Sequence, residues 1–131
     1  MLNNRYRYRV TQINKIVDGD TIDLTIDLGF CISFSERFRL YGINAPELRT
    51  DPGKKSKTRL GSFLGVDPAE TWDSPIILDD DLTIEAQTIL YKTKPKPRKG
   101  KYGRWLCILY CNDIDINEEM VKTGAAVDAI Y

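Results

Sequence analysis

The stretch TIDLTIDLGF, Thr21 to Phe30, decides the fold class, and it directly follows the turn DGD, residues 18–20. Apolar side chains occupy every second position from Ile22 to Leu28, and Asp or Thr occupies the positions between them. A period of two kept over four repeats predicts a β-strand with one face in a core. Asp-Gly is an ordinary turn signal, so Asp20 could do no more than start this strand. Whether it also holds a ligand depends on the rest of the chain.

The same alternation appears on both sides of this strand. It recurs in RYRYRV, residues 5–10, and in ERFRLYGI, residues 36–43, where Phe38 and Leu40 face away from Arg37 and Arg39. Further strands are predicted in residues 82–94 and 104–111. A short or irregular helix is predicted in residues 55–65, with a loop before it at 44–55. A last helix, residues 116–124, can be capped by Asp115 or Asn117 and ended by Gly124.

Many short strands with few helices favour a small barrel over a βαβ fold. The predicted class is α+β, mainly β. The 131 residues are enough for one domain with a real core, and no repeat or domain boundary divides residues 1–131.

Charge is distributed unevenly along the chain, although the formal net charge is zero. Seven acidic and no basic residues lie between Asp67 and Glu85, and seven basic and no acidic residues lie between Lys92 and Arg104. The basic segment suits a phosphate backbone, and it would also be an ordinary solvated loop.

Several classes of protein are excluded or disfavoured. The chain has no histidine, which excludes His-ligated zinc, Ser-His triads and imidazole acid–base chemistry. No apolar run approaches the roughly 18 residues of a membrane span, and MLNNRYRYRV has no signal-peptide core. We therefore expect a cytoplasmic protein, or one encoded by a virus or mobile element. Cys107 and Cys111 lie about 13 Å apart on one strand, so we expect two buried thiols rather than a disulfide.

Four motifs occur in a fixed order: VDGDT, RFRLYGINAPE, GKYGR and INEEMVKTGAA. Each alone is weak, because Asp-Gly turns and Pro-Glu loops are common. Together, and from about Val10 to the end of the chain, they resemble the staphylococcal nuclease-like (thermonuclease-like) family. The resemblance implies an OB-type five-stranded barrel with flanking helices. It also implies a calcium-dependent nuclease that cleaves DNA and/or RNA with little sequence specificity.

The resemblance also assigns roles to single residues. Asp20 and Asn44 fall on metal-ligand positions, and Ala45 on one whose backbone carbonyl reaches the metal. Arg39 and Arg104 fall on the catalytic arginines, and Glu47 on the proposed general base. For nucleic-acid binding, we expect contributions from Lys101 and Tyr102 beside the phosphate and from Lys94, Lys96 and Lys99 in the basic segment.

The chemistry of these residue types agrees with the assignment. Ca²⁺ takes oxygen ligands, which Asp20 and Asn44 supply, although other divalent cations are possible. Each arginine can donate two parallel hydrogen bonds to a phosphate. Without histidine, a carboxylate such as Glu47 must assist the attacking water. The expected partners are DNA and/or RNA, in single-stranded or unpaired regions. No membrane partner is expected, and the protein is expected to be a monomer.

The chain departs from the family at Asn44, where the usual residue is Asp. An amide oxygen can bind Ca²⁺, but it lacks the charge, so metal affinity should fall. An alternative function follows from this departure: a catalytically weak or inactive nuclease-like domain that binds nucleic acid or a protein partner.

Overall fold

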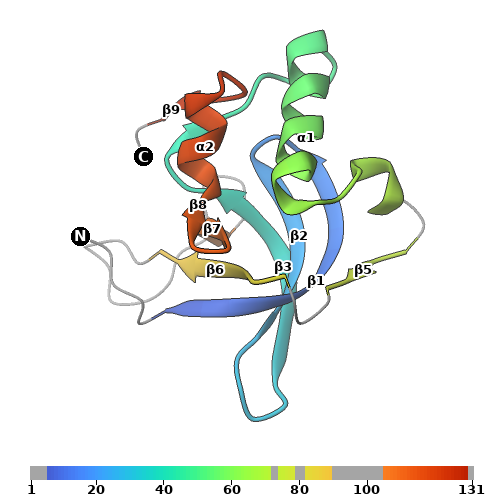
Figure 1. The fold of residues 1–131 in the computed structure, drawn as a ribbon, viewed down its shortest axis with the longest axis vertical. Helices are drawn as coiled ribbons and strands as arrows, with labels where there is room; N and C mark the ends of the chain where they lie inside the picture. Colours follow the sequence, from blue (N-terminus) through green and yellow to red (C-terminus); the bar gives the residue numbers. More distant parts are fainter. Residues whose placement is uncertain (1–5, 72–73, 79–81, 90–104, 130–131) are drawn as a thin grey trace.

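The computed structural model describes residues 6–71, 74–78, 82–89 and 105–129. Within these residues, five strands close into a barrel in the order β1-β2-β3-β7-β6 and back to β1 (Figure 1). Neighbouring strands are antiparallel except β3 and β7, which are parallel. The barrel strands are β1 Arg7–Asp18, β2 Thr21–Asp27, β3 Ser33–Leu40, β6 Ile84–Thr88 and β7 Trp105–Cys111. This is the predicted OB-type α+β fold.

The alternating pattern places the apolar face of each strand inside the barrel. Ile22, Leu24 and Ile26 of β2 and Phe38 and Leu40 of β3 are at most 2% exposed. The face assignment made from the sequence is therefore confirmed for these residues. Leu28, predicted on the same face, instead lies beyond the end of β2 and is 39% exposed.

Strand β1 is longer than the predicted 5–10 segment and runs to Asp18. Its pairing with β2 shifts register at three places: between Val10 and Gln12, Ile13 and Lys15, and Ile16 and Asp18. Such bulges bend a strand, and the bend lets β1 pair with β2 on one side and β6 on the other. The bulges therefore help to close the barrel.

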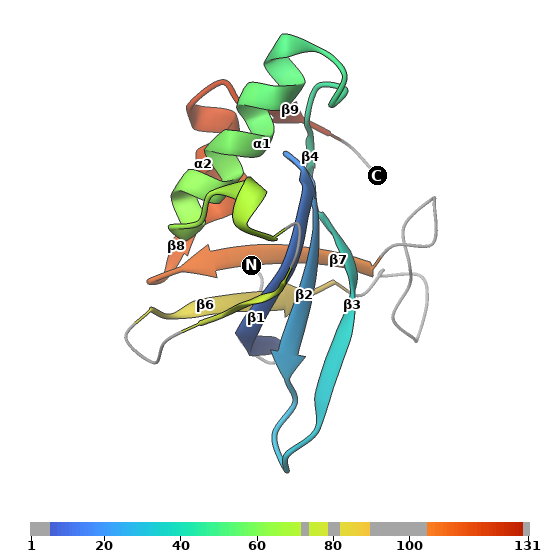
Figure 2. The ribbon, with the colours of Figure 1, turned by 90° about the vertical axis from the view of Figure 1, so that its right-hand side faces the viewer.

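Both helices lie over one end of the barrel, and the β2–β3 hairpin projects from the other end (Figure 2). Helix α1 is Asp51–Leu64 and helix α2 is Ile116–Lys122. The remaining elements are the 3-10 helix η1 Pro68–Thr71 and the short strands β4 Ile43–Asn44, β5 Ile76–Ile77, β8 Ile114–Asp115 and β9 Val127–Asp128. Of the two predicted caps of α2, Asp115 is the one used.

Helix α1 corrects the prediction of a short, irregular helix over residues 55–65. It is regular over 14 residues and begins at Asp51, inside the segment predicted as a loop. Thr50 caps it by accepting a hydrogen bond from the Gly53 N–H, and Pro52 suits its first turn. Gly61 does not interrupt the helix. A Cβ there would lie 2.3 Å from the Val66 carbonyl oxygen, so glycine permits close packing of the chain that follows.

Other sequence predictions have clear outcomes. Strand β6 covers only part of the predicted 82–94 strand, and positions from 90 onward lie outside the described residues. Cys107 and Cys111 are both buried and free, as expected. No helix in the described part of the chain is long and apolar enough to cross a membrane.

Candidate active site

The turn between β1 and β2 is held tightly on both sides. The Asp20 N–H donates to the Asp18 carboxylate at 3.0 Å, and the Asp20 carbonyl accepts from the Leu40 N–H at 2.8 Å. A Cβ at Gly19 would lie 1.8 Å from Ser56 Oγ of α1, so only glycine fits between the turn and the helix. The backbone that carries Asp20 is therefore fixed by β3 and by α1 together.

Asp20 is 6% exposed as a residue, and each of its carboxylate oxygens has a polar partner. Oδ1 accepts from Thr21 Oγ1 at 3.0 Å, and Oδ2 accepts from the Ala45 N–H at 2.9 Å. Oδ2 also forms an ion pair with Arg39 Nη1 at 2.9 Å. Because these contacts already fix the carboxylate, it loses little conformational freedom when a ligand binds.

Arg39 extends from the outer face of β3, where it pairs in register with Thr21. Its second terminal nitrogen, Nη2, donates to the Ile43 carbonyl at 3.1 Å and to the Asn44 side-chain oxygen. Oxygens of Asp20, Ile43 and Asn44 therefore converge on one guanidinium, whose side chain is 12% exposed. A cluster of carboxylate, amide and carbonyl oxygens is suited to a cation.

Asp18 and Asp20 form an acidic pair in which each carboxyl group shifts the pKa of the other. Burial, together with hydrogen bonding to Asp20 and the charge of Asp20, raises the pKa of Asp18 from 3.8 to about 6. Burial also opposes ionisation of Asp20, but hydrogen bonds from Asp18, Ala45 and Thr21 and the charge of Arg39 outweigh it and lower the Asp20 pKa. At neutral pH Asp20 is therefore ionised, and Asp18 adds a second carboxylate beside it. The sequence reasoning overlooked Asp18, although the i, i+2 acidic spacing in DGD signalled it.

Glu47 lies on the loop that leads into α1. Its carbonyl accepts from the Thr50 N–H at 3.0 Å and from Thr50 Oγ1 at 2.6 Å. A Cβ at Gly53 would lie 1.9 Å from that carbonyl oxygen, so the loop packs directly on the helix. The Glu47 carboxylate is 68% exposed and forms an ion pair with Arg49 Nε at 2.7 Å. The backbone at Glu47 is thus fixed, while its side chain extends into solvent.

The structure brings Asp20, Arg39, Asn44 and Ala45 together, and the Glu47 side chain extends into solvent from the loop that follows them. The other residues of the predicted site lie outside the described residues: Arg104, Lys101, Tyr102, Lys94, Lys96 and Lys99.

The oxygen atoms around Arg39 include types that a hard divalent cation binds. Among the described residues, no group of three or more His, Cys, Asp or Glu side chains could hold a metal ion. Asp18 and Asp20 supply two carboxylates, and the Asn44 amide and nearby backbone carbonyls supply neutral oxygens. Ca²⁺ accepts such a mixed oxygen set, so the donor chemistry fits, with one negative charge fewer than an aspartate at position 44 would give.

Comparison with known proteins identifies the family of this chain. The model of the staphylococcal nuclease homologue family matches residues 37–131, and the chain belongs to this family. A protein of Bacillus anthracis described as uncharacterised is 30% identical over 117 residues, which cover 87% of this chain and 44% of that protein. A "Probable staphylococcal-like nuclease" of Oryza sativa subsp. japonica is 30% identical over 90 residues, 69% of this chain and 18% of that protein. The chain thus spans less than half of each of these relatives.

Proposed function

We propose that this chain is a metal-dependent phosphodiesterase that cleaves DNA and/or RNA with little sequence specificity. The observation that supports this most strongly is the convergence of the Asp20, Ile43 and Asn44 oxygens on the Arg39 guanidinium. This convergence supports a cation site beside a phosphate-binding arginine, and both can stabilise the charge that develops in phosphodiester cleavage.

Each residue has a distinct role in this proposal. Asp20, Asn44 and the Ala45 carbonyl would hold the cation, and Asp18 would add negative charge beside them. When bound, Ca²⁺ or a similar ion polarises the phosphoryl oxygens. Arg39 then exchanges its contacts with Asp20 and Asn44 for two hydrogen bonds to phosphate oxygens. These bonds strengthen as charge develops in the transition state.

Glu47 is proposed as the base that takes a proton from the attacking water. In the structure its carboxylate pairs with Arg49, so the base must leave this ion pair before it acts. The pair is highly exposed, and such pairs contribute at most about 1 kcal/mol, so the exchange is inexpensive. Arg104 is proposed as the second catalytic arginine, and the basic segment with Lys94, Lys96, Lys99, Lys101 and Tyr102 is proposed to bind the strand.

The test is incubation of the pure protein with plasmid and with single-stranded DNA and RNA, in Ca²⁺, Mg²⁺, Mn²⁺ or EDTA. Cleavage that requires a divalent cation is expected. Glu47→Gln should lower the rate at least about a hundredfold while binding to single-stranded DNA stays nearly unchanged. Arg49→Ala is the matched control, because it removes the ion pair of Glu47 and leaves the carboxylate. A Glu47→Gln variant that cuts like the parent would remove Glu47 from the mechanism.

A second function is favoured by the same contacts. Arg39 already neutralises the Asp20 carboxylate and donates to the Asn44 oxygen, and Asn44 lacks the charge that draws a metal. These two features suit a domain that binds nucleic acid without cutting it. Binding in EDTA with no cleavage in any of the three metals would support this second function and overturn the first.

The cellular setting belongs to the proposal as well. A nuclease with broad specificity endangers its own cell, so we propose tight metal control of a cytoplasmic protein, or an origin in a virus or mobile element. The protein is proposed to act as a monomer on unpaired strands.

A further inference from the structure

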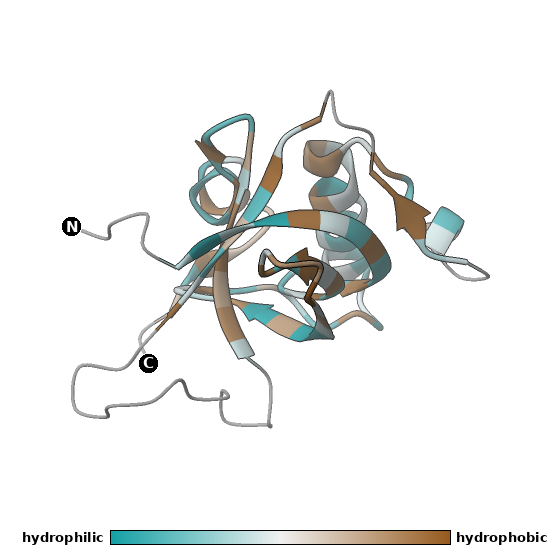
Figure 3. Cartoon of the chain, turned by 90° about the horizontal axis from the view of Figure 1, so that it is seen from below, coloured by the Kyte–Doolittle hydropathy of each residue, from teal (hydrophilic) through white to brown (hydrophobic). Residues whose placement is uncertain are grey.

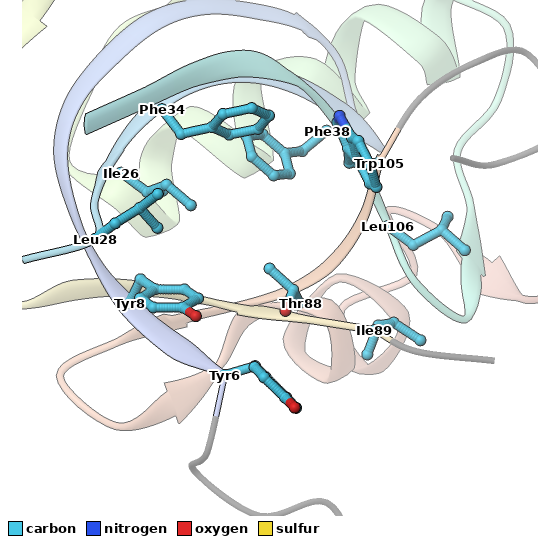
Figure 4. A pocket seen from close by; sticks show the side chains of 10 residues that line it. All are labelled: Tyr6, Tyr8, Ile26, Leu28, Phe34, Phe38, Thr88, Ile89, Trp105 and Leu106. Carbon is cyan, nitrogen blue, oxygen red and sulfur yellow. The ribbon is translucent and has the colours of Figure 1, made fainter. Parts of the chain in front are cut away.

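The two ends of the barrel differ in the chemistry that they bury. The end opposite the helices contains a cavity of about 320 Å³ lined mainly by aromatic and aliphatic side chains, among them Tyr8, Phe34 and Trp105 (Figure 4). Apolar positions also lie at the tip of the β2–β3 hairpin, which projects from this end (Figure 3). At the other end, helix α1 packs on the turn that carries Asp18 and Asp20, and a polar atom is buried there without a partner.

That atom is Oγ of Ser56, on the buried face of α1. Ser56 is 0% exposed, and within the described residues its hydroxyl has no hydrogen-bond partner. A hydroxyl inside a helix can donate to the carbonyl four residues earlier. Thr58 of the same helix does so, to the Lys54 carbonyl at 3.1 Å, whereas Ser56 does not. A buried hydroxyl left unpaired costs stability, and alanine at the same position would avoid that cost.

The Ser56 hydroxyl borders both segments that supply the proposed cation ligands. A Cβ placed on Gly19 would lie 1.8 Å from Ser56 Oγ and 2.9 Å from the Ala45 Cβ. Gly19 joins Asp18 to Asp20, and the Ala45 N–H donates to the Asp20 carboxylate. The hydroxyl oxygen therefore faces the backbone of the turn, close to Ala45.

The backbone of this turn depends on a carboxylate that a cation would also attract. The Asp20 N–H donates to Asp18 Oδ1 at 3.0 Å, and carboxylate oxygens are preferred ligands of Ca²⁺. If Asp18 turned its carboxylate toward a cation, the Asp20 N–H would lose its acceptor within a residue that is only 6% exposed. A buried N–H without an acceptor is costly, so a replacement is needed. Ser56 Oγ, packed against the neighbouring Gly19, is an acceptor that no other group uses.

We infer that Ser56 is a positioning residue of the cation site: its hydroxyl oxygen accepts from the Asp20 N–H when Asp18 turns its carboxylate toward the cation. The inference rests on the proposed function, which it deepens by stating how the turn is held while a cation is bound. The exchange keeps the Asp20 N–H paired in both states. It also gives a use to a hydroxyl that only costs stability in the metal-free protein.

The test measures Ca²⁺ affinity and metal-free stability separately on the same variant. Calorimetry gives the Kd for Ca²⁺, and urea titration in EDTA gives the unfolding midpoint. Ser56→Ala should raise the Kd about two- to tenfold, the equivalent of one hydrogen bond. The same variant should raise the urea midpoint in EDTA, because it removes an unpaired buried hydroxyl. A hydroxyl with a merely structural role would not stabilise the metal-free protein when removed and weaken Ca²⁺ binding at the same time.

Thr71→Val is the matched control, because Thr71 carries a buried hydroxyl with a structural role. Thr71 is 3% exposed, and its Oγ1 donates to the Pro68 carbonyl at 2.7 Å and accepts from the Ile16 N–H at 3.3 Å. Removal of this hydroxyl should lower the urea midpoint in EDTA and leave the Kd for Ca²⁺ unchanged.

The outcomes separate this inference from the proposed function. An unchanged Kd in Ser56→Ala overturns the inference and leaves the nuclease. A lowered urea midpoint does the same, because it would show that the hydroxyl is already paired in the metal-free protein. A raised Kd and a raised midpoint in a protein that cuts neither DNA nor RNA support the role of Ser56 and overturn the nuclease. A parent that binds no Ca²⁺ in calorimetry overturns the cation site and the inference together. If Ser56→Ala does not fold, Ser56→Cys replaces it, because a thiol is a weak acceptor of similar size, and the same rise in Kd is expected.

Discussion

Two arginine–aspartate pairs on β3 differ in burial and in their other partners. Arg37 and Arg39 lie two positions apart on the outer face of β3; Arg37 pairs with Asp23 of β2, and Arg39 pairs with Asp20 of the turn before β2. Arg37 binds Asp23 through two hydrogen bonds of 2.7 and 3.1 Å, with side chains 47% and 23% exposed. The Arg39 and Asp20 side chains are 12% and 8% exposed.

The Arg37–Asp23 pair, which has two hydrogen bonds, is not part of the candidate site. Arg37 satisfies one carboxylate in solvent, where such a pair contributes little. Arg39 donates to oxygens of Asp20, Ile43 and Asn44. Each of these oxygens is also of a type that can bind a cation. The difference arises from what surrounds each pair. Arg39 contacts the turn at residues 18–20 and strand β4, whereas Arg37 lies on the exposed outer surface of the barrel.

The largest expected effect is on turnover. Arg39→Ala should lower kcat by about a hundred- to a thousandfold, the usual cost of losing one transition-state donor. Arg37→Ala should change kcat less than about twofold. Steady-state kinetics on single-stranded DNA with saturating Ca²⁺ measures both. Equal losses in the two variants would mean that the site is not defined by Arg39.

The next effect is on stability in EDTA at pH 7. Asp20→Asn removes the charged partner of a mostly buried guanidinium and should lower the free energy of unfolding by about 2 kcal/mol. Asp23→Asn should lower it by less than about 1 kcal/mol, because its pair is exposed. Urea titrations of the two variants and the parent provide the comparison. Similar midpoints for both variants would contradict the contrast in burial.

Asn44→Asp sharpens the comparison by adding charge only to the Arg39 site. The Ca²⁺ midpoint should move to lower concentration by a factor of about ten, equivalent to about 1.4 kcal/mol. Since Arg39 lies between residue 44 and Asp20, it partly neutralises the added carboxylate when metal is absent. The apo protein should therefore lose only a little stability. Asn112→Asp, in the turn after β7, is the control for net charge, and calorimetry with Ca²⁺ measures both. An unchanged midpoint would remove Asn44 from the metal site.

The smallest effect concerns pH and Asp18. Its pKa is raised from 3.8 to about 6 in the folded protein, so the native state holds this proton more tightly than the unfolded chain does. The resulting stability is fully present below pH 3.8 and is lost as the pH rises through about 6. Because the carboxyl is partly open to solvent, the loss should be on the order of 1 kcal/mol. Urea titrations in EDTA between pH 4 and 7 should show this decline in the parent and in Asp23→Asn, but not in Asp18→Asn. A decline of equal size in Asp18→Asn would assign it to another group.

The sequence by itself determined the strand faces and the identity of the family. Strict alternation in β2 and β3 leaves one possible assignment of inside and outside, because a shift of one residue would bury Asp23 and Asp27. The motifs around Asp20, Arg39, Asn44 and Glu47 supplied the candidate residues, since family motifs preserve the local chain that carries them.

Only the tertiary structure decided how these residues are connected. The contact of Arg39 with Asp20 depends on the β2–β3 register, and its contact with Asn44 depends on the turn that follows β3. The start of α1 at Asp51 depends on close packing at Gly53, and the position of the Asp18 turn depends on the fit of Gly19 against Ser56. The cavity lined by Tyr8, Phe34 and Trp105 likewise arises only on closure, when β1, β3 and β7 bring these residues to one end of the barrel. Local patterns report which face a side chain takes, but the partners it meets there come from segments distant in sequence.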